Sequence, residues 1–379
     1  MQVLNSIADL RDLARRRIPR AIFDYADRGS YDELTLRRNR RDLDALEFRQ
    51  RVMRDLSGTS VAGTMLGEPV TMPLAIAPTA LCGLFYGDGE IHGARAAQSF
   101  GIPFCLSTMS ICSIEDLHAA VSKPFWFQIY LMKDRGFNQE LVDRARATGC
   151  SALMLTVDLP IMGLRRRDAK NGLSVPPRMT VRSALDMLGK PAWMLRVLMG
   201  RRRTLGNLAR HGGGGVTTLA KWTASQFNAA ITWKDVQWLR TVWPGKLIIK
   251  GVLDSDDAHI ASDLNIDALV VSNHGGRQLD GAPSTISVLP EIVAAVKDKC
   301  EVWFDGGIQS GQDVLRALAL GARACLIGKS FLYALAAAGG PGVTLALNIL
   351  RSELAVSMAL TGCTNLQQID AGVLRQRQI

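Results

Sequence analysis

Residues 246–273 read KLIIKGVLDSDDAHIASDLNIDALVVSN, and this stretch decides the fold. Two β-rich apolar runs, 246–251 and 268–273, lie on either side of an amphipathic segment, 255–264. An apolar run of this kind predicts a strand that is buried on both faces. Two such strands with a helix between them predict a β–α–β unit, in which the strands lie parallel in one sheet.

The same unit recurs along the chain. Amphipathic segments alternate with the apolar runs, and SIED at 113–116 has the form of a capping box, which marks the start of a helix. Eight such units predict a closed (β/α)₈ barrel, the TIM barrel, which usually takes about 250 residues. The alternative is an open doubly wound sheet, although no GxGxxG motif follows the first strand. The strand candidates are 74–80, 104–108, 125–131, 152–158, 246–251, 268–273, 301–307 and 324–329.

The rest of the chain is assigned around this barrel. We expect a single domain over residues 1–379, with the barrel over about 73–360. A helical extension precedes Pro73, and a long insertion over about 159–230 interrupts the fourth unit. The last helices, roughly 341–360, then close the outside of the barrel.

The composition argues against several classes of protein. No run of eighteen apolar residues occurs, so we expect no membrane-spanning helix. The first residues carry Asp9 and Asp12 and have no continuous apolar core, which argues against a secretory signal. Seven cysteines without a CxxC pair predict buried, reduced thiols in a cytosolic compartment, and neither a disulfide frame nor a metal site.

The net charge of +10 is concentrated in one segment. Between Arg165 and Arg210 there are twelve Lys and Arg against two Asp, so the rest of the chain is neutral. A single basic cluster with no recognition motif and few aromatic residues argues against a nucleic-acid partner. The segment therefore needs another explanation.

Polar residues gather where the predicted strands end. Barrel enzymes carry out their chemistry at the C-terminal ends of their strands. A charged side chain within an apolar run is costly unless it is paired, so Asp158, Lys250 and His274 are candidates for function. Asp158 and Lys250 could instead form a structural ion pair. The residues at the strand ends are Thr79, Ala80, Ser107, Thr108, Gln128, Tyr130, Thr156, Asp158, Lys250, Ser272, His274, Asp305, Gly328 and Lys329.

Two glycine-containing turns follow the seventh and eighth strands. DGGIQSG at 305–311 and GKS at 328–330 expose backbone amides, and barrels commonly bind a phosphate group at these two loops. We expect the phosphate to belong to a cofactor or to the substrate.

His274 and Arg277 stand close together in SNHGGRQLDG, on backbone that the two glycines leave bare. A base beside a cation that binds carboxylates in a forked geometry suits an anionic substrate that loses a proton. Asp158 could hold the protonated imidazole, and Lys250 could stabilise a developing anion.

These residues resemble the FMN-dependent L-2-hydroxy acid dehydrogenase/oxidase family. The resemblance rests on SNHGGRQLDG (272–281) with IAPTA (76–80), LST (106–108), FQIY (127–130), LTVDLP (155–160) and the spacing to Lys250, and it runs from about Tyr25 to Gly362. TLRRN (35–39), STMSICSIED, DRGF and KSFLYALAAAGGPGV resemble the bacterial respiratory L-lactate dehydrogenase branch.

The resemblance implies a role for each matching position. His274 is implied as the active-site base, Asp158 as the group that stabilises its imidazolium, and Tyr130 as a hydrogen-bond donor to the substrate oxygen. Arg277 is implied to bind the substrate carboxylate, with Tyr25 and Arg165 nearby. Lys250 is implied to stabilise the reduced flavin. FMN is implied to contact Pro78, Thr79, Ala80, Ser107, Gln128, Thr156, Lys250, Ser272, Asp305, Gly306, Gly307, Gln309, Gly328 and Lys329.

Two positions depart from the family pattern. The family often has arginine at the positions of Gln309 and Lys329, and lysine cannot reproduce the forked contacts of arginine. The phosphate of FMN is therefore expected to be held more weakly. In the pocket for the substrate's side chain we expect Leu81, Met109 and Met162, which are apolar and pliable and allow lactate without excluding larger acids.

The basic insertion combines cations with large apolar residues. Within 178–215, Trp193 to Met199 are mostly apolar and are followed by Arg201 to Arg203. This composition predicts a peripheral contact with an anionic membrane, and an oligomer contact or a surface loop is the alternative. Related dehydrogenases use this insertion to reach the membrane, where a quinone could take the electrons. The resemblance also suggests a homotetramer on the cytoplasmic face of the inner membrane.

The sequence predicts FMN-dependent oxidation of an L-2-hydroxy acid, L-lactate first, to the 2-oxo acid, with electrons passed to a membrane quinone or another acceptor. An oxidase that uses oxygen and a mandelate-type dehydrogenase are the alternatives within redox chemistry. A barrel isomerase or lyase whose loops bind a substrate phosphate is the non-redox alternative.

Overall fold

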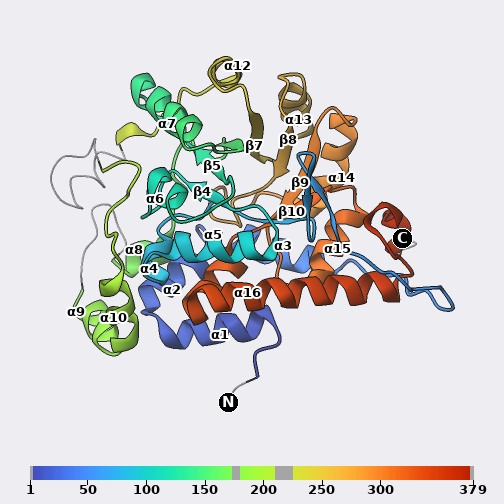
Figure 1. Ribbon diagram of the computed structural model, residues 1–379, viewed down its shortest axis with the longest axis horizontal. Helices are drawn as coiled ribbons and strands as arrows, with labels where there is room; N and C mark the ends of the chain where they lie inside the picture. The colour runs from blue at the N-terminus through green and yellow to red at the C-terminus, as the bar shows by residue number, and fades with distance from the viewer. Residues whose placement is uncertain (1–2, 173–179, 210–224, 376–379) are drawn as a thin grey trace.

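The computed structural model describes residues 3–172, 180–209 and 225–375, and eight parallel strands in it form one barrel-like sheet (Figure 1). Hydrogen-bonded neighbours follow the order β3-β10-β9-β8-β7-β6-β5-β4, and a parallel bridge between Ile76 and Phe104 joins the two ends. The predicted TIM barrel is confirmed, and the doubly wound alternative is wrong. The strands are β3 Leu74–Ile76, β4 Cys105–Ser107, β5 Trp126–Ile129, β6 Ala152–Thr156, β7 Lys246–Val252, β8 Ala268–Val271, β9 Glu301–Asp305 and β10 Ala324–Ile327.

Each strand is followed by a helix on the outside of the barrel. The capping box predicted at 113–116 is present, because Ser113 Oγ accepts from the amide of Asp116 and the Asp116 carboxylate accepts from the amide of Ser113. The short helix α4 (Cys82–Phe85) precedes the first barrel helix. The barrel helices are α5 Gly89–Phe100, α6 Ile114–His118, α7 Arg135–Ala147, α12 Trp233–Val242, α13 Ser255–Ser262, α14 Thr285–Val296, α15 Gly311–Ala319 and α16 Lys329–Leu360.

The predicted helical extension before Pro73 is present and contains α1 Ile7–Arg17, α2 Arg20–Asp27 and α3 Leu34–Asp44. Helix α1 packs along α16, and the two lie side by side in Figure 1. The segment from α2 to α3 contacts the barrel mouth, because the amide of Ser30 donates to the carbonyl of Gly276 at 2.9 Å. The extension is therefore part of the wall around the strand ends.

A hairpin that the sequence does not predict closes the other end of the barrel. Strands β1 (Gly63–Met65) and β2 (Glu68–Val70) pair antiparallel through a turn at Leu66 and Gly67, both with positive φ. Met65 and Val70 pack into the barrel interior, where Trp126 and Trp303 stack with ring centroids 5.2 Å apart. Strands of three residues show no alternating pattern, and Leu-Gly is not among the usual hairpin turn pairs, so the sequence carries little signal.

The insertion lies between β6 and α12 and contains α8 (Arg166–Lys170), α9 (Val181–Leu188) and α10 (Pro191–Met199). Trp193 of α10 is buried, and its Nε1 donates to the carbonyl of Leu84 at 2.8 Å, which attaches this helix to the barrel. Residues 173–179 and 210–224, which include both ends of the predicted basic segment 178–215, lie outside the described residues.

Helix α16 begins earlier in the chain than the predicted helix over 341–360. Non-helical angles at Ala338 and Gly339 divide it, so the predicted helix over 341–360 corresponds to its second part. In the described part of the chain it is the one helix long and apolar enough to cross a membrane by length and composition, but 72% of its most apolar 18-residue window is buried in the fold. Such burial is typical of a core helix.

Candidate active site

The loop after β8 presents His274 on unusual backbone. His274 has a φ of 57° and is followed by Gly275 and Gly276, which also have positive φ. A Cβ on Gly276 would lie 2.6 Å from the amide nitrogen of Leu36, so only glycine lets α3 pack against this loop. The amide of His274 donates to Ser272 Oγ at 3.1 Å, which holds the turn in place.

His274 and Asp158 form a hydrogen-bonded pair. His274 Nδ1 lies 2.8 Å from Asp158 Oδ1. Burial lowers the pKa of His274, although Asp158 opposes the shift. Burial works against the charge of Asp158 too, but the nearby His274 and Lys250 hold the pKa of its carboxyl below the usual value. A neutral imidazole whose Nδ1 hydrogen is donated to a carboxylate leaves Nε2 as an acceptor, and this arrangement can take up a proton.

Lys250 is buried in a second polar cluster. Its Nζ lies 2.8 Å from Ser272 Oγ and 3.0 Å from Asp305 Oδ2, and Ser272 Oγ donates to the same Asp305 oxygen at 2.7 Å. Burial lowers the pKa of Lys250, but the charges of Asp305 and Asp158 outweigh it, and the net shift is upward. Among the described ion pairs Lys250 pairs with Asp305, so the alternative pairing of Lys250 with Asp158 is wrong.

Two arginines and two tyrosines gather beside this pair. The guanidinium of Arg277 lies 4.7 Å from the ring centre of Tyr25 and donates to the carbonyls of Tyr25 and Arg28. The guanidinium of Arg165 lies 5.9 Å from the same ring. Burial, and secondly Arg165, lowers the pKa of Arg277 to about 10, while burial raises the pKa of Tyr130. Two partly buried cations beside one tyrosine ring favour binding of an anion.

Buried donors without partners mark the expected flavin site. Gln128 Oε1 accepts from Ser107 Oγ at 3.2 Å and from the amide of Thr108 at 3.1 Å. Gln128 Nε2 and Thr156 Oγ1 are buried and have no hydrogen-bond partner among the described residues. Buried polar groups are normally paired, so these two atoms fit a ligand with hydrogen-bonding edges, such as the ring system of a flavin.

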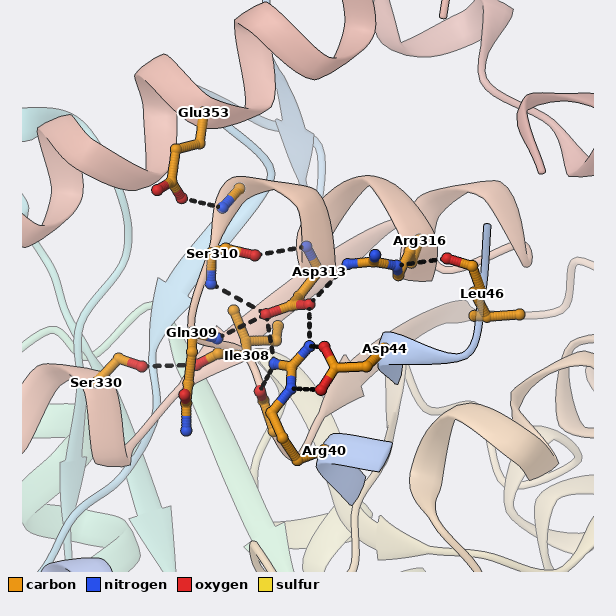
Figure 2. Close-up of polar contacts among 12 residues, drawn as sticks. Arg40, Asp44, Leu46, Ile308, Gln309, Ser310, Asp313, Arg316, Ser330 and Glu353 are labelled. Carbon is orange, nitrogen blue, oxygen red and sulfur yellow. Dashed lines mark hydrogen bonds and ion pairs between the residues drawn. The ribbon is translucent and has the colours of Figure 1, made fainter. Parts of the chain in front are cut away.

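A network of charges behind the loop after β9 sets its shape (Figure 2). The Asp313 carboxylate accepts from the amides of Gln309 at 2.9 Å and Ser310 at 3.0 Å. Arg40 of α3 donates to both Asp313 oxygens at 2.7 Å and to the carbonyl of Gly307 at 2.8 Å. Glu353 of α16 accepts at 2.7 Å from the amide of Gly311, the residue after Ser310.

The two departures from the family pattern lie at the expected phosphate site. The side chain of Gln309 is exposed and points away from the Asp313 network in Figure 2. Lys329 begins α16, and its Nζ donates to the carbonyl of Asp27 at 2.9 Å. Burial, together with Arg277, lowers the pKa of Lys329 to about 7. The strand-end glycines and the N-terminus of α16 thus offer backbone amides to a phosphate. Of the two side chains, Gln309 carries no charge and Lys329 is a weaker cation than an ordinary lysine.

The structure does not bring all predicted pocket residues together. Leu81 and Met109 are half-buried and hydrogen-bond to each other, because the amide of Leu81 donates to the carbonyl of Met109 at 3.2 Å. Met162 is 43% exposed and lines a cavity of about 310 Å³ whose walls include Asp158, Ile161 and Leu279 but none of the tyrosines or arginines of the site.

The sequence does not predict the residues whose side chains hydrogen-bond the backbone of the barrel-mouth loops. Arg40 donates to the carbonyl of Gly307, which is far away in the chain, and Glu90 accepts from the amide of Ile111. Asp313 accepts from the amides of Gln309 and Ser310 just before it. The one usable signal was the Ser-Gly-Gln-Asp sequence at 310–313, which has the form of a capping box and forms one.

Comparisons with known proteins give a consistent result. The family model for FMN-dependent dehydrogenases matches residues 14–376. An L-lactate dehydrogenase of Caulobacter sp. (strain K31) is 47% identical over 98% of both chains, and one of Acinetobacter baumannii (strain ATCC 17978) is 44% identical over 99% of this chain and 98% of that one. Among solved structures, the monotopic membrane protein (S)-mandelate dehydrogenase has a TM-score of 0.95 at 36% identity over 99% of this chain and all of that one. A mandelate oxidase has a TM-score of 0.85 at 38% identity over 99% of both chains.

Proposed function

Because the chain belongs to the FMN-dependent dehydrogenase family, we propose that it oxidises L-lactate to the corresponding 2-oxo acid. Family membership makes it an oxidoreductase that acts on CH–OH groups and uses FMN, and it removes the non-redox alternative. The observation that carries the substrate class is the hydrogen bond between His274 and Asp158, together with Arg277 and Arg165, whose guanidinium groups both lie beside the ring of Tyr25. A base and an anion site side by side suit a 2-hydroxy acid.

The residues divide the work as follows in this proposal. Arg277 binds the substrate carboxylate with the help of Tyr25 and Arg165, and Tyr130 donates a hydrogen bond to the substrate oxygen. His274 Nε2 takes the proton that the substrate releases, and Asp158 stabilises the imidazolium.

Bound FMN supplies the two-electron acceptor for the oxidation. We assign its ring edge to Gln128 and Thr156, whose buried atoms lack partners, and Lys250 to the stabilisation of negative charge on it. The other assigned contacts are Pro78, Thr79, Ala80, Ser107, Ser272, Asp305, Gly306, Gly307, Gln309, Gly328 and Lys329.

Anaerobic bleaching of the bound flavin by a panel of 2-hydroxy acids tests the proposal. L-Lactate is expected to bleach it and D-lactate is not. (S)-Mandelate is the second candidate, because two relatives of known structure are a mandelate dehydrogenase and a mandelate oxidase and because Leu81 and Met109 are apolar. A preference for mandelate would favour a mandelate-type dehydrogenase instead. Hydrogen peroxide released at the rate of turnover would favour an oxidase.

We expect Arg277→Lys to raise KM for L-lactate about tenfold or more, with a smaller effect on kcat, because a point charge replaces a forked donor. Steady-state kinetics with a soluble dye measure this. The control is Arg323→Lys on the exposed surface, where the side chain is 70% exposed. Unchanged KM in Arg277→Lys contradicts the carboxylate assignment.

We expect Gln309→Arg to tighten FMN binding about tenfold to a hundredfold, because a cation that is hydrogen-bonded to a phosphate adds about 1.5–3 kcal/mol. Titration of the apoprotein with FMN and with riboflavin measures this. Riboflavin lacks the phosphate, so its affinity should not change. An equal gain for both ligands assigns the effect to general stabilisation of the loop.

We also propose that the insertion binds an anionic membrane on the cytoplasmic face, where a quinone accepts the electrons. Arg201 and Arg203 are exposed next to a set of exposed apolar residues, and one solved relative is described as a monotopic membrane protein. The homotetramer stays a prediction from resemblance. The exposed apolar residues of α9 and α10 are Val181, Leu185, Leu188, Leu195, Leu198 and Met199.

Two substitutions test the membrane contact. The double variant Leu195→Glu/Leu198→Glu is expected to lose binding to anionic vesicles and to keep its activity with a soluble dye. The control Val356→Glu/Leu360→Glu changes two residues of α16 that are equally exposed, at 56% and 55%, and should still bind. Vesicle co-sedimentation measures both, and retained binding in the first variant contradicts the assignment.

A further inference from the structure

Two loops of the barrel mouth carry Leu81 and Met109, the apolar side chains that are expected in the substrate pocket. Leu81 follows β3 and Met109 follows β4, and a backbone hydrogen bond of 3.2 Å joins them. Leu81 has a φ of 58°, a left-handed conformation that leucine rarely adopts. Such a conformation persists only where the surrounding contacts enforce it.

Glu90 of α5 binds both loops from behind. Its Oε1 accepts from the amide of Cys82 at 3.1 Å and from the amide of Ile111 at 2.8 Å. The residue is 1% exposed. Burial raises the pKa of Glu90, which favours the neutral carboxyl. One oxygen atom of Glu90 thus holds Cys82, next to Leu81, and Ile111, two residues after Met109.

The packing around Glu90 leaves these loops little freedom. A Cβ on Gly83 would lie 2.9 Å from Cβ of Ile111, and a Cβ on Gly89 would lie 2.5 Å from the carbonyl oxygen of Cys82. Helices α4 and α5 therefore contact the two loops directly. A shift of either loop needs the Glu90 hydrogen bonds to break.

We propose that Glu90 is a positioning residue for substrate specificity, which sets the spacing of Leu81 and Met109 and so the width of the pocket for the substrate's side chain. The inference rests on the proposed function, since it concerns the same 2-hydroxy acid site. Glu90 is buried behind the two loops. It acts through the amides of Cys82 and Ile111.

The test compares kcat/KM for L-lactate and for (S)-mandelate. In Glu90→Ala the ratio of kcat/KM for L-lactate to kcat/KM for (S)-mandelate should fall about tenfold. A relaxed pocket admits the larger phenyl group of mandelate and holds the methyl group of lactate less well. Glu90→Gln keeps the accepting oxygen and should stay within about twofold of the original ratio. The side chain in Glu90→Asp is one methylene shorter, so this variant should also lower the ratio. It replaces Glu90→Ala in the test if the alanine variant does not fold.

Glu353→Ala is the matched control, because Glu353 also accepts from a loop amide but lies behind the loop after β9. Its ratio should not change. A ratio that is unchanged in Glu90→Ala or Glu90→Asp with FMN bound overturns the inference, as does an equal shift in Glu353→Ala. If the unaltered protein is bleached by neither acid, the proposed function fails instead, before the variants are compared.

Discussion

We expect the His274→Gln variant to bind FMN and to lose flavin reduction by L-lactate by about 10²- to 10⁴-fold, the usual contribution of a general base. Glutamine keeps a polar side chain of similar size but cannot take up a proton. The imidazole of His274 donates to Asp158, and burial lowers its pKa, which favours the neutral form whose Nε2 can accept a proton. Stopped-flow absorbance under anaerobic conditions measures the rate.

His259→Gln is the control for this loss. His259 lies on α13, is 56% exposed in its side chain and faces Asp263 on the outside of the barrel. Its substitution should leave the reduction rate unchanged. If His274→Gln is reduced at the original rate, His274 is not the base.

The second large effect is on stability and arises at Asp313. Its side chain is fully buried and accepts from Arg40, from Arg316 and from two loop amides. Removing one partner of a buried charge network leaves the others uncompensated, which costs about 3–5 kcal/mol. We expect Asp313→Ala to lower the free energy of unfolding by this amount and to weaken FMN binding, as measured by urea unfolding and flavin titration.

Asp263→Ala is the control, because Asp263 is 51% exposed and pairs with Lys299 on the surface. An exposed pair contributes about 0–1 kcal/mol. A comparably small loss in Asp313→Ala would mean that the loop after β9 does not depend on this network.

The sequence predicts the barrel well because its strands are continuous apolar runs with helices between them. Lys250 and Asp158 could be identified as candidates because each charge interrupts or ends such a run. Their partners could not be chosen from sequence, because the choice between Asp158 and Asp305 for Lys250 depends on how neighbouring strands are staggered.

The residues that shape the loops could not be predicted. Glu90 and Arg40 bind backbone amides and carbonyls, and any segment has such groups, so no residue pattern marks the partner. The hairpin β1–β2 was missed for a related reason, since its three-residue strands are held by burial of Met65 and carry no pattern of their own.

The end of α2 has a consequence for the synthesis of the protein. The carbonyls of Tyr25 and Arg28 accept from Arg277, and that of Asp27 accepts from Lys329, 302 residues further along the chain. The first helices leave the ribosome long before these cations do. A nascent chain therefore cannot complete either the anion site or the cofactor cradle until almost all of it has been made, so flavin loading follows translation.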